Sequence, residues 1–227
     1  MSLRAVLFDA GNTLLFLDYY RLAPAVAEAT GVPLTGAGLA AQAGAAARAL
    51  ERAEVTDRAR ASRYLETLFR LAGVPDHQID VVRDTLFRLH REKHLWAQVA
   101  PGTVEGLERL RNAGYRLAVV SNSDGRAEEG LRAAGLREYF ELVVDSHLVG
   151  VEKPDPRIFQ VALDRLGVSP AEAIYVGDIY EVDAVGARRA GMESILLDPL
   201  GTHAGRDLRV AASFPEVVAL VLGTDKP

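Results

Sequence analysis

Short apolar segments that alternate with helical patterns constrain the fold of this chain more than any other feature. They are rich in Val, Ile or Leu, and they lie at Ala5–Phe8, Arg116–Ser121, Glu141–Asp145, Ala173–Gly177 and Ser194–Asp198. Continuous apolar strands of this kind are typical of parallel sheets that helices cover on both faces. The sequence therefore predicts an α/β fold with a doubly wound parallel sheet.

One helix between these strands has clear start and stop signals. Asp155 is expected to cap it, Pro156 lies in its first turn, and Gly167 is expected to end it. One face of this helix is apolar and comprises Ile158, Phe159, Ala162, Leu163 and Leu166.

Residues 17–97 have a different pattern, without a convincing strand and rich in Ala, Leu, Arg and Glu. Helices are expected near 20–30, 38–54, 57–72 and 78–95. We therefore predict a core domain of residues 1–16 and 98–227 and an inserted all-helical domain of residues 17–97. Because the insertion follows the first strand, we expect it to cover the carboxyl end of that strand as a lid, where open α/β sheets bind ligands.

The composition excludes several classes of function. The chain has 227 residues, a net charge of -5 and no cysteine. The charge gives no general attraction to nucleic acid or anionic lipid, and the absence of cysteine excludes disulfides, thiolate metal sites and a cysteine nucleophile. No apolar run reaches the roughly 18 residues that a membrane span needs, and no signal-peptide pattern is visible. We expect a cytoplasmic protein without nucleic-acid or membrane partners, whose oligomeric state the sequence does not indicate.

Polar groups follow four of the predicted apolar segments or the loops after them. They are Asp9-Ala10-Gly11-Asn12-Thr13, Ser121-Asn122, Lys153-Pro154, and Gly177-Asp178 with Asp183. The carboxyl ends of parallel strands share one edge, so these groups are expected to converge. Clustered aspartates resist ionisation unless a cation neutralises them, and an all-oxygen set suits Mg²⁺. A lysine nearby offers a movable charge for a phosphate or carboxylate.

These motifs, with the helical insertion after the first, resemble the haloacid dehalogenase-like (HAD) superfamily of hydrolases over essentially the whole chain. The resemblance implies a Rossmann-like core with a helical cap. It implies Asp9 as a nucleophile that forms an aspartyl intermediate, Lys153 as a catalytic and substrate-binding residue, and Ser121 and Asn122 as substrate ligands. It implies Mg²⁺ held by Asp9, Gly11, Asp178 and Asp183, with Gly11 using its carbonyl and Asp183 acting as a ligand or as a partner of one.

The chain departs from the superfamily pattern at Gly11. Phosphatases of this superfamily usually carry a second aspartate there, a general acid–base worth about 10² to 10⁴ in rate. A glycine carbonyl can bind a metal but cannot move a proton. We therefore expect a Mg²⁺-dependent phosphatase that acts on a small phosphorylated metabolite and favours good leaving groups.

Three other functions remain open at this stage. A 2-haloacid dehalogenase needs no proton for a departing halide, but that branch usually lacks the glycine–aspartate pair. A phosphonate hydrolase needs a cap lysine, and the insertion offers only Lys93. The third alternative is a non-catalytic ligand-binding protein. Glu181 is expected to be a solvated charge and His147 a loop histidine, although either is a candidate if another residue supplies the proton.

Overall fold

A computed structural model describes residues 2–50, 57–201, 203 and 208–224. It confirms the α/β fold with a parallel sheet. The described residues fall into two compact units, one formed by Met1–Phe16 and Gln98–Pro227 and the other by Leu17–Ala97.

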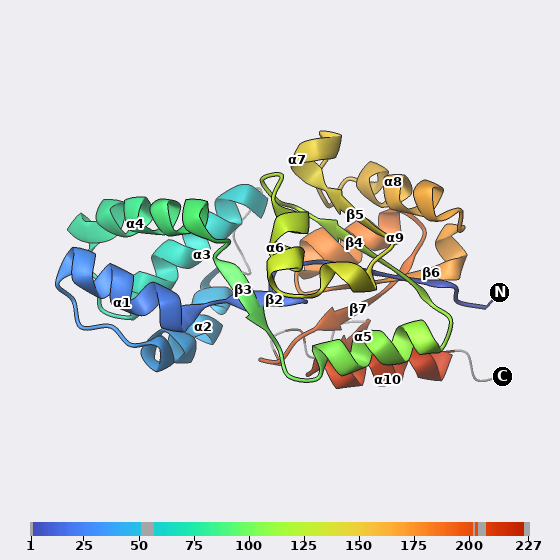
Figure 1. Cartoon of the computed structure of the whole chain (residues 1–227), viewed down its shortest axis with the longest axis horizontal. Helices are drawn as coiled ribbons and strands as arrows, with labels where there is room; N and C mark the ends of the chain where they lie inside the picture. Colours follow the sequence, from blue (N-terminus) through green and yellow to red (C-terminus); the bar gives the residue numbers. More distant parts are fainter. Residues whose placement is uncertain (1, 51–56, 202, 204–207, 225–227) are drawn as a thin grey trace. The chain divides into compact units, whose positions relative to one another are not determined.

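The first unit is built on a six-stranded sheet in the order β5-β4-β1-β6-β7-β8 (Figure 1). The strands are β1 (Ala5–Phe8), β4 (Arg116–Ser121), β5 (Leu142–Asp145), β6 (Ala173–Gly177), β7 (Glu193–Leu197) and β8 (Arg209–Ala211). Every paired neighbour runs parallel. The chain builds outward from β1 in one direction through β4 and β5, and then in the other through β6, β7 and β8. A ligand site is therefore expected beside β1, where the order reverses.

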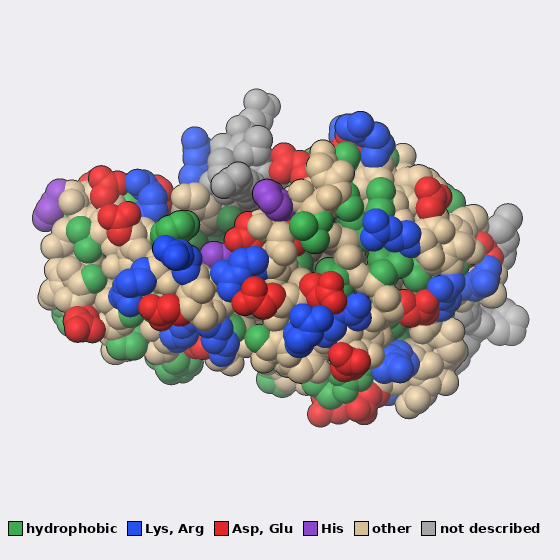
Figure 2. All heavy atoms as spheres, turned by 45° about the horizontal axis from the view of Figure 1, so that its top comes forward, with side chains coloured by type: hydrophobic (Ala, Val, Ile, Leu, Met, Phe, Trp, Pro, Cys, Tyr) green, Lys and Arg blue, Asp and Glu red, His purple; other side chains and the backbone are tan. Residues whose placement is uncertain are grey.

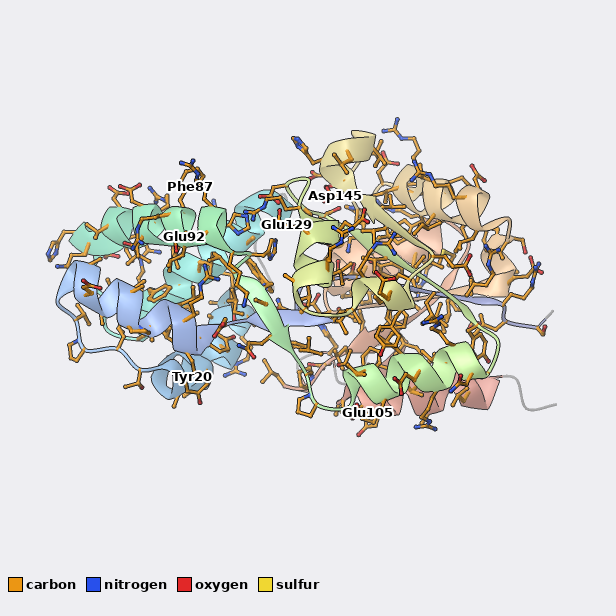
Figure 3. The ribbon with its side chains drawn as sticks, in the orientation of Figure 1. Tyr20, Phe87, Glu92, Glu105, Glu129 and Asp145 are labelled. Atoms are coloured by element: carbon orange, nitrogen blue, oxygen red, sulfur yellow. The ribbon has the colours of Figure 1, made fainter. Side chains whose placement is uncertain are left out.

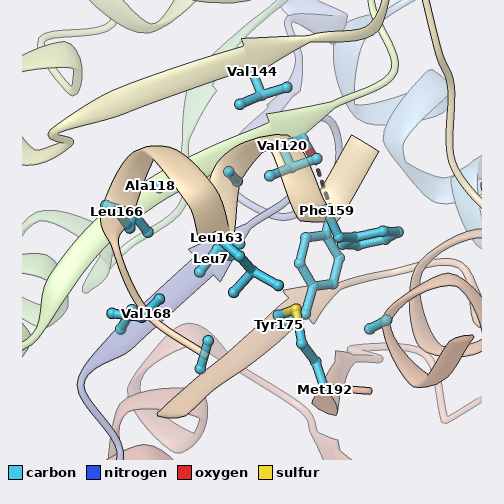
Figure 4. Close-up of a cluster of buried hydrophobic side chains, with 14 of the residues drawn as sticks. Leu7, Ala118, Val120, Val144, Phe159, Leu163, Leu166, Val168, Tyr175 and Met192 are labelled. Carbon is cyan, nitrogen blue, oxygen red and sulfur yellow. Dashed lines mark hydrogen bonds between the residues drawn. The ribbon is translucent and has the colours of Figure 1, made fainter. Parts of the chain in front are cut away.

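The helices of this unit are α5 (Thr103–Asn112), α6 (Ala127–Ala133), α7 (Ser146–Val149), α8 (Pro156–Leu166), α9 (Val185–Arg189) and α10 (Phe214–Thr224). Short 3-10 turns lie at Arg137–Tyr139 and Pro170–Glu172, and a π-helical turn lies at Tyr180–Ala184. The alternation of side chains in β1 divides them between the two faces of the sheet. Leu7 shares a buried cluster with the apolar face of α8 (Figure 4). Phe8 stacks on Phe214 of α10, with ring centroids 5.8 Å apart.

The expected boundaries of α8 are confirmed. The side chain of Asp155 accepts a hydrogen bond from the backbone of Arg157, Pro156 lies in the first turn, and Gly167 ends the helix in the left-handed conformation with φ of 61°. The five residues predicted for its apolar face are all buried. These signals are local, which is why sequence reasoning located them.

The second unit contains α1 (Tyr19–Thr30), α2 (Gly36–Leu50), α3 (Asp57–Leu71), a 3-10 turn (Asp76–Gln78) and α4 (Ile79–Glu92). It has its own buried core, which includes Leu22, Val26, Leu68, Phe69 and Leu86. The helix expected at 38–54 is described only to Leu50, and residues 51–54 of that prediction lie outside the described residues. No described helix combines the length and apolar character that a membrane span requires.

The sequence-based prediction missed three strands. The strand β8 is three residues long, and β2 (Leu15–Leu17) pairs with β3 (Trp96–Val99) in a separate two-stranded sheet. The helix expected to run to residue 95 therefore ends at Glu92. Strands this short carry too little periodicity to be recognised, since their pairing depends on a partner distant in sequence.

Hydrogen bonds join the two ends of the helical unit. The backbone N–H of Asp18 donates to the carbonyl of Leu95 at 3.1 Å. The guanidinium of Arg21 donates to the carbonyls of His94 at 3.1 Å and Lys93 at 2.9 Å, and also to Leu89. Arg21 thus caps the C-terminal end of α4, where a cation is favourable.

Charged side chains of both signs are interspersed on the face shown in Figure 2. Ion pairs at the surface include Arg83 with Glu66 at 3.0 Å and Arg126 with Glu129 at 2.7 Å. Exposed pairs of this kind contribute little to stability, about 0–1 kcal/mol each. The packed cores of the two units therefore account for more of the stability than these surface charges do.

Candidate active site

Asp9 lies at the carboxyl edge of the sheet, directly after the buried strand β1. Its backbone N–H donates to the carbonyl of Val176 at 2.8 Å, so it continues the pairing with β6. Phe8 is in register with Val119 of β4 and Val176 of β6. Ser121 and Asp178 therefore emerge at the same edge, on either side of Asp9. Asp9 is 7% exposed, so its carboxylate is held in a largely buried place.

The chain turns sharply after Asp9. The N–H of Leu14 and that of Leu15 both donate to the carbonyl of Ala10, and the N–H of Asn12 donates to the carbonyl of Leu15 at 2.7 Å. The left-handed residue of this turn is Asn12, with φ of 55°. Asparagine tolerates that conformation better than most residues. Gly11 is half-buried at the start of this turn, next to Asn12.

Lys153 lies at the centre of the cluster. Its Nζ is 2.6 Å from Oδ1 of Asp9, 2.7 Å from Oδ1 of Asp183 and 2.9 Å from Oη of Tyr175. The lysine side chain is 1% exposed. An ammonium has three protons to donate, and each of these oxygens accepts one. The cation that the clustered aspartates need is therefore supplied in part by the chain itself.

Asp183 is a fully buried carboxylate with hydrogen bonds to both oxygens. Oδ1 accepts from Lys153, while Oδ2 accepts from the backbone N–H groups of Asp178 at 3.0 Å and Ile179 at 2.9 Å. These bonds hold the turn that carries Asp178. A Cβ on Gly177 would lie 2.4 Å from Cγ of Asp183, so only glycine allows this close approach. The packing of the Asp183 carboxylate thus explains why a glycine, Gly177, precedes Asp178.

One group of three carboxylates could hold a metal ion. Asp9, Asp178 and Asp183 each offer an oxygen, and these oxygens lie within 4.8 Å of one another. An all-oxygen donor set of this kind fits a hard cation such as Mg²⁺. Both oxygens of Asp183 already accept hydrogen bonds. Asp178 directly follows β6 and is half-buried.

Ser121 is the last residue of β4, and Asn122 directly follows it. Ser121 is 4% exposed. The amide of Asn122 pairs with the backbone of Lys153, because Oδ1 accepts from its N–H at 2.8 Å and Nδ2 donates to its carbonyl at 3.0 Å. The family resemblance implies that Asn122 contacts the substrate. In this structure its side chain holds the Lys153 segment against β4.

Asp145 at the end of β5 was not singled out by the sequence reasoning. Its carboxylate accepts from the backbone N–H groups of Gly125 at 3.2 Å, Ala127 at 3.1 Å and His147 at 3.0 Å. Figure 3 shows it beside the loop that leads into α6. The carboxylate therefore shapes the loop that follows Ser121 and Asn122. An aspartate that directly follows an apolar strand was the available signal.

Tyr175 was also missed, because a tyrosine within a buried strand is usually a packing residue. It is fully buried on β6, and its hydroxyl contacts Lys153 and donates to the carbonyl of Val120 at 2.8 Å. Burial raises the pKa of the Tyr175 hydroxyl well above 10, and the neighbouring Lys153 ammonium only partly opposes this. The phenol therefore stays protonated at neutral pH.

His147 and Glu181 are the two alternative candidates for a proton donor. Both side chains are exposed, with His147 on α7 and Glu181 on the π-helical turn that also carries Asp183. The expectation that Glu181 is solvated agrees with this position. His147 lies in a short helix rather than a loop, because Asp145 caps that helix.

The core unit is thus an α/β fold with a doubly wound parallel sheet and a buried carboxylate–lysine cluster at the carboxyl edge of that sheet. A family model for haloacid dehalogenase-like hydrolases matches residues 3–191. The chain belongs to this family.

Two curated relatives show how far the similarity extends. The chain is 48% identical over 130 residues to haloacid dehalogenase-like hydrolase domain-containing protein 3 of Mus musculus, covering 57% of this chain and 51% of the relative. It is 38% identical over 134 residues to glyceraldehyde 3-phosphate phosphatase of Methanopyrus kandleri, covering 59% and 57%. The chain thus spans about half the length of the curated relatives it matches.

Solved structures match over nearly the whole chain. The magnesium-bound HAD-hydrolase YfnB of Bacillus subtilis gives a TM-score of 0.70 at 19% identity, covering 97% of this chain and 99% of that one, which supports the fold alone. A dehalogenase gives a TM-score of 0.65 at 27% identity, with coverage of 96% and 97%.

Proposed function

We propose that this hydrolase is a Mg²⁺-dependent phosphatase that acts on a small phosphorylated metabolite through an aspartyl-phosphate intermediate. The observation that carries the proposal is the contact of 2.6 Å between Lys153 and Asp9, next to the oxygens of Asp178 and Asp183. This arrangement supports a nucleophilic role for Asp9 and a metal site beside it, at the carboxyl edge of the sheet. The relative named glyceraldehyde 3-phosphate phosphatase supports phosphate chemistry.

In the proposed reaction, a carboxylate oxygen of Asp9 attacks the phosphorus of the substrate. The bond between phosphorus and the leaving-group oxygen breaks, and its electron pair leaves with that oxygen. Water then attacks the phosphorus of the aspartyl phosphate, which releases inorganic phosphate and restores the carboxylate. The ammonium of Lys153 and the hydroxyl of Ser121 bind the oxygens of the transferred group.

The metal would be held by Asp9, the carbonyl of Gly11, Asp178 and Asp183. Asp183 would act either as a direct ligand or by supporting the turn that carries Asp178. When bound, Mg²⁺ would neutralise negative charge on the phosphoryl group and on the clustered carboxylates. The unit Leu17–Ala97 would serve as the cap that the family resemblance implies.

Gly11 determines the proposed preference for leaving groups. Without an acid at this position, the leaving group departs as an anion, so the rate should depend steeply on its pKa. Acyl and aryl phosphates are therefore the favoured class. Two described groups near Asp9 are already engaged in hydrogen bonds and do not replace the missing acid. Both oxygens of Asp183 accept hydrogen bonds, and the Tyr175 hydroxyl donates its proton to the carbonyl of Val120.

A second candidate is a 2-haloacid dehalogenase. The similarity to a solved dehalogenase and the missing acid at Gly11 favour it. The oxygen cluster of Asp9, Asp178 and Asp183 favours the phosphatase instead, because a halide needs no metal to depart.

One screen tests both candidates. Acetyl phosphate, p-nitrophenyl phosphate, glycerol 3-phosphate and 2-chloropropionate are each incubated with the protein, with Mg²⁺ or with EDTA, and released phosphate or chloride is measured. We expect Mg²⁺-dependent phosphate release that Asp9→Asn abolishes. Asp164→Asn on the exposed side of α8 is the matched control and should retain full activity. Chloride release without phosphate release would overturn the phosphatase proposal in favour of the dehalogenase.

A further inference from the structure

The hydroxyl of Tyr175 is a contact of the Lys153 ammonium that is not a carboxylate. Two of the acceptors around Nζ, Asp9 and Asp183, belong to the proposed phosphatase site. The third, the hydroxyl of Tyr175 at 2.9 Å, has no role in the proposed reaction. A buried hydroxyl placed against a buried ammonium calls for a functional explanation.

The hydroxyl is oriented by a second hydrogen bond. Its proton is donated to the carbonyl of Val120 at 2.8 Å, drawn as the dashed line in Figure 4. The oxygen lone pairs are therefore left to accept from Lys153. Val120 lies on β4 and Tyr175 on β6, so the side chain reaches across β1, the strand that carries Asp9.

The ring of Tyr175 is held independently of the hydroxyl. It makes an edge contact with Phe159 of α8, with centroids 4.9 Å apart and an interplanar angle of 81°. The Lys153 nitrogen lies 5.4 Å from the Tyr175 ring centroid. A phenylalanine at this position would keep both contacts, so Tyr175→Phe removes the hydroxyl and little else.

We propose that Tyr175 is a positioning residue for Lys153, which fixes the ammonium between Asp9 and Asp183 by accepting its third proton. The inference rests on the proposed function, because the charge of the positioned ammonium is what would stabilise the transferred phosphoryl oxygens. Without the hydroxyl, one N–H of a buried cation loses its acceptor, and the ammonium shifts to find another. The geometry between lysine and nucleophile then loosens, and transition-state stabilisation falls.

The first experiment separates this role from packing. Steady-state kcat and KM for acetyl phosphate are measured with saturating Mg²⁺ for the wild type, Tyr175→Phe and the matched control Tyr139→Phe, at a temperature where unfolding curves show each protein folded. Tyr139 also donates its hydroxyl to a side chain, Glu108 at 3.3 Å, but lies on the 3-10 turn after α6. We expect kcat of Tyr175→Phe to fall about 10- to 100-fold, with KM within threefold, and Tyr139→Phe to match the wild type. A kcat of Tyr175→Phe within twofold of the wild type would overturn the inference.

The second experiment does not require activity. Unfolding in urea is measured for the wild type, Tyr175→Phe, Lys153→Met and the double variant. We expect Tyr175→Phe to raise the unfolding equilibrium constant in both backgrounds, because the Val120 carbonyl loses its hydrogen bond in each, but at least about fivefold more in the wild type than when Lys153 is already Met. Equal effects in the two backgrounds would mean that Tyr175 acts without Lys153 and would overturn the inference. If the wild type releases no phosphate from any ester, the proposed function fails, and this cycle still decides whether Tyr175 acts through Lys153.

Discussion

Lys153 and Asp9 are separated by 144 positions in the sequence, yet the ammonium of one lies 2.6 Å from a carboxylate oxygen of the other. Both side chains are largely buried, with exposed fractions of 1% and 10%. Removing one partner of a buried pair leaves an uncompensated charge, which is costly. We therefore expect this pair and its neighbours to affect both the stability of the strand edge and the proposed reaction.

Lys153→Met is expected to destabilise the protein by about 3–5 kcal/mol in EDTA, since Asp9 and Asp183 lose their shared cation. Mg²⁺ should restore part of this loss, because it can neutralise the same carboxylates. Urea unfolding with EDTA and with Mg²⁺ measures both effects. Lys93→Met, at an exposed lysine after α4, is the control and should stay within about 0.5 kcal/mol of the wild type. A Lys153→Met protein as stable as the wild type would contradict the importance of this pair.

Mg²⁺ is expected to raise the thermal midpoint of the wild type, because a ligand that binds only the folded state stabilises it by mass action. The gain is about 2.7 kcal/mol at a concentration 100 times the Kd. Asp178→Asn should raise the midpoint in EDTA by relieving carboxylate repulsion, and should lose most of the Mg²⁺ response. Calorimetry of both proteins in EDTA and in Mg²⁺ checks the two opposite signs, with Asp164→Asn as the control. Equal midpoints of the wild type in EDTA and in excess Mg²⁺ would count against a metal site.

Gly11 is expected to make the rate depend on the leaving group. Aryl and acyl phosphates should be cleaved more than about 100-fold faster than alkyl phosphates, the lower end of what a general acid contributes. Gly11→Asp should selectively raise cleavage of glycerol 3-phosphate by at least about tenfold, because it supplies an acid near the scissile bond. Similar rates on alkyl and aryl substrates in the wild type would show that another residue donates the proton. His147→Ala and Glu181→Gln would then identify which.

Asn122 and Ser121 are expected to respond differently to alanine. Asn122→Ala breaks two hydrogen bonds to the backbone of Lys153 and should lower the free energy of unfolding by about 1–3 kcal/mol, together with kcat. Ser121→Ala should raise KM for a phosphate ester with a smaller change in stability, because its proposed partner is the substrate. Kinetics and urea unfolding of the two variants provide the comparison. An Asn122→Ala protein that changes only KM would return this residue to the substrate-binding group.

Local patterns determined most of the architecture. Apolar runs identified β1, β4, β5, β6 and β7 because a strand buried on both faces must be apolar along its whole length. The cap at Asp155 and the stop at Gly167 bounded α8 because both depend on a few adjacent residues. The short β8 was missed because three residues carry no periodicity, and only its pairing with β7 makes it a strand.

The sequence by itself also determined which polar residues stand at the carboxyl edge, because each one follows a recognisable strand or the loop after it. Only the tertiary structure decided how they pair. Lys153 shares its protons among Asp9, Asp183 and Tyr175, and Asn122 binds the lysine backbone. These partners come from different strands and loops, and the strand order that brings them together is a property of the whole sheet. A tyrosine in an apolar strand has the same sequence pattern whether its hydroxyl meets a carbonyl or an ammonium, so the role of Tyr175 became visible only when β4, β1 and β6 lay side by side.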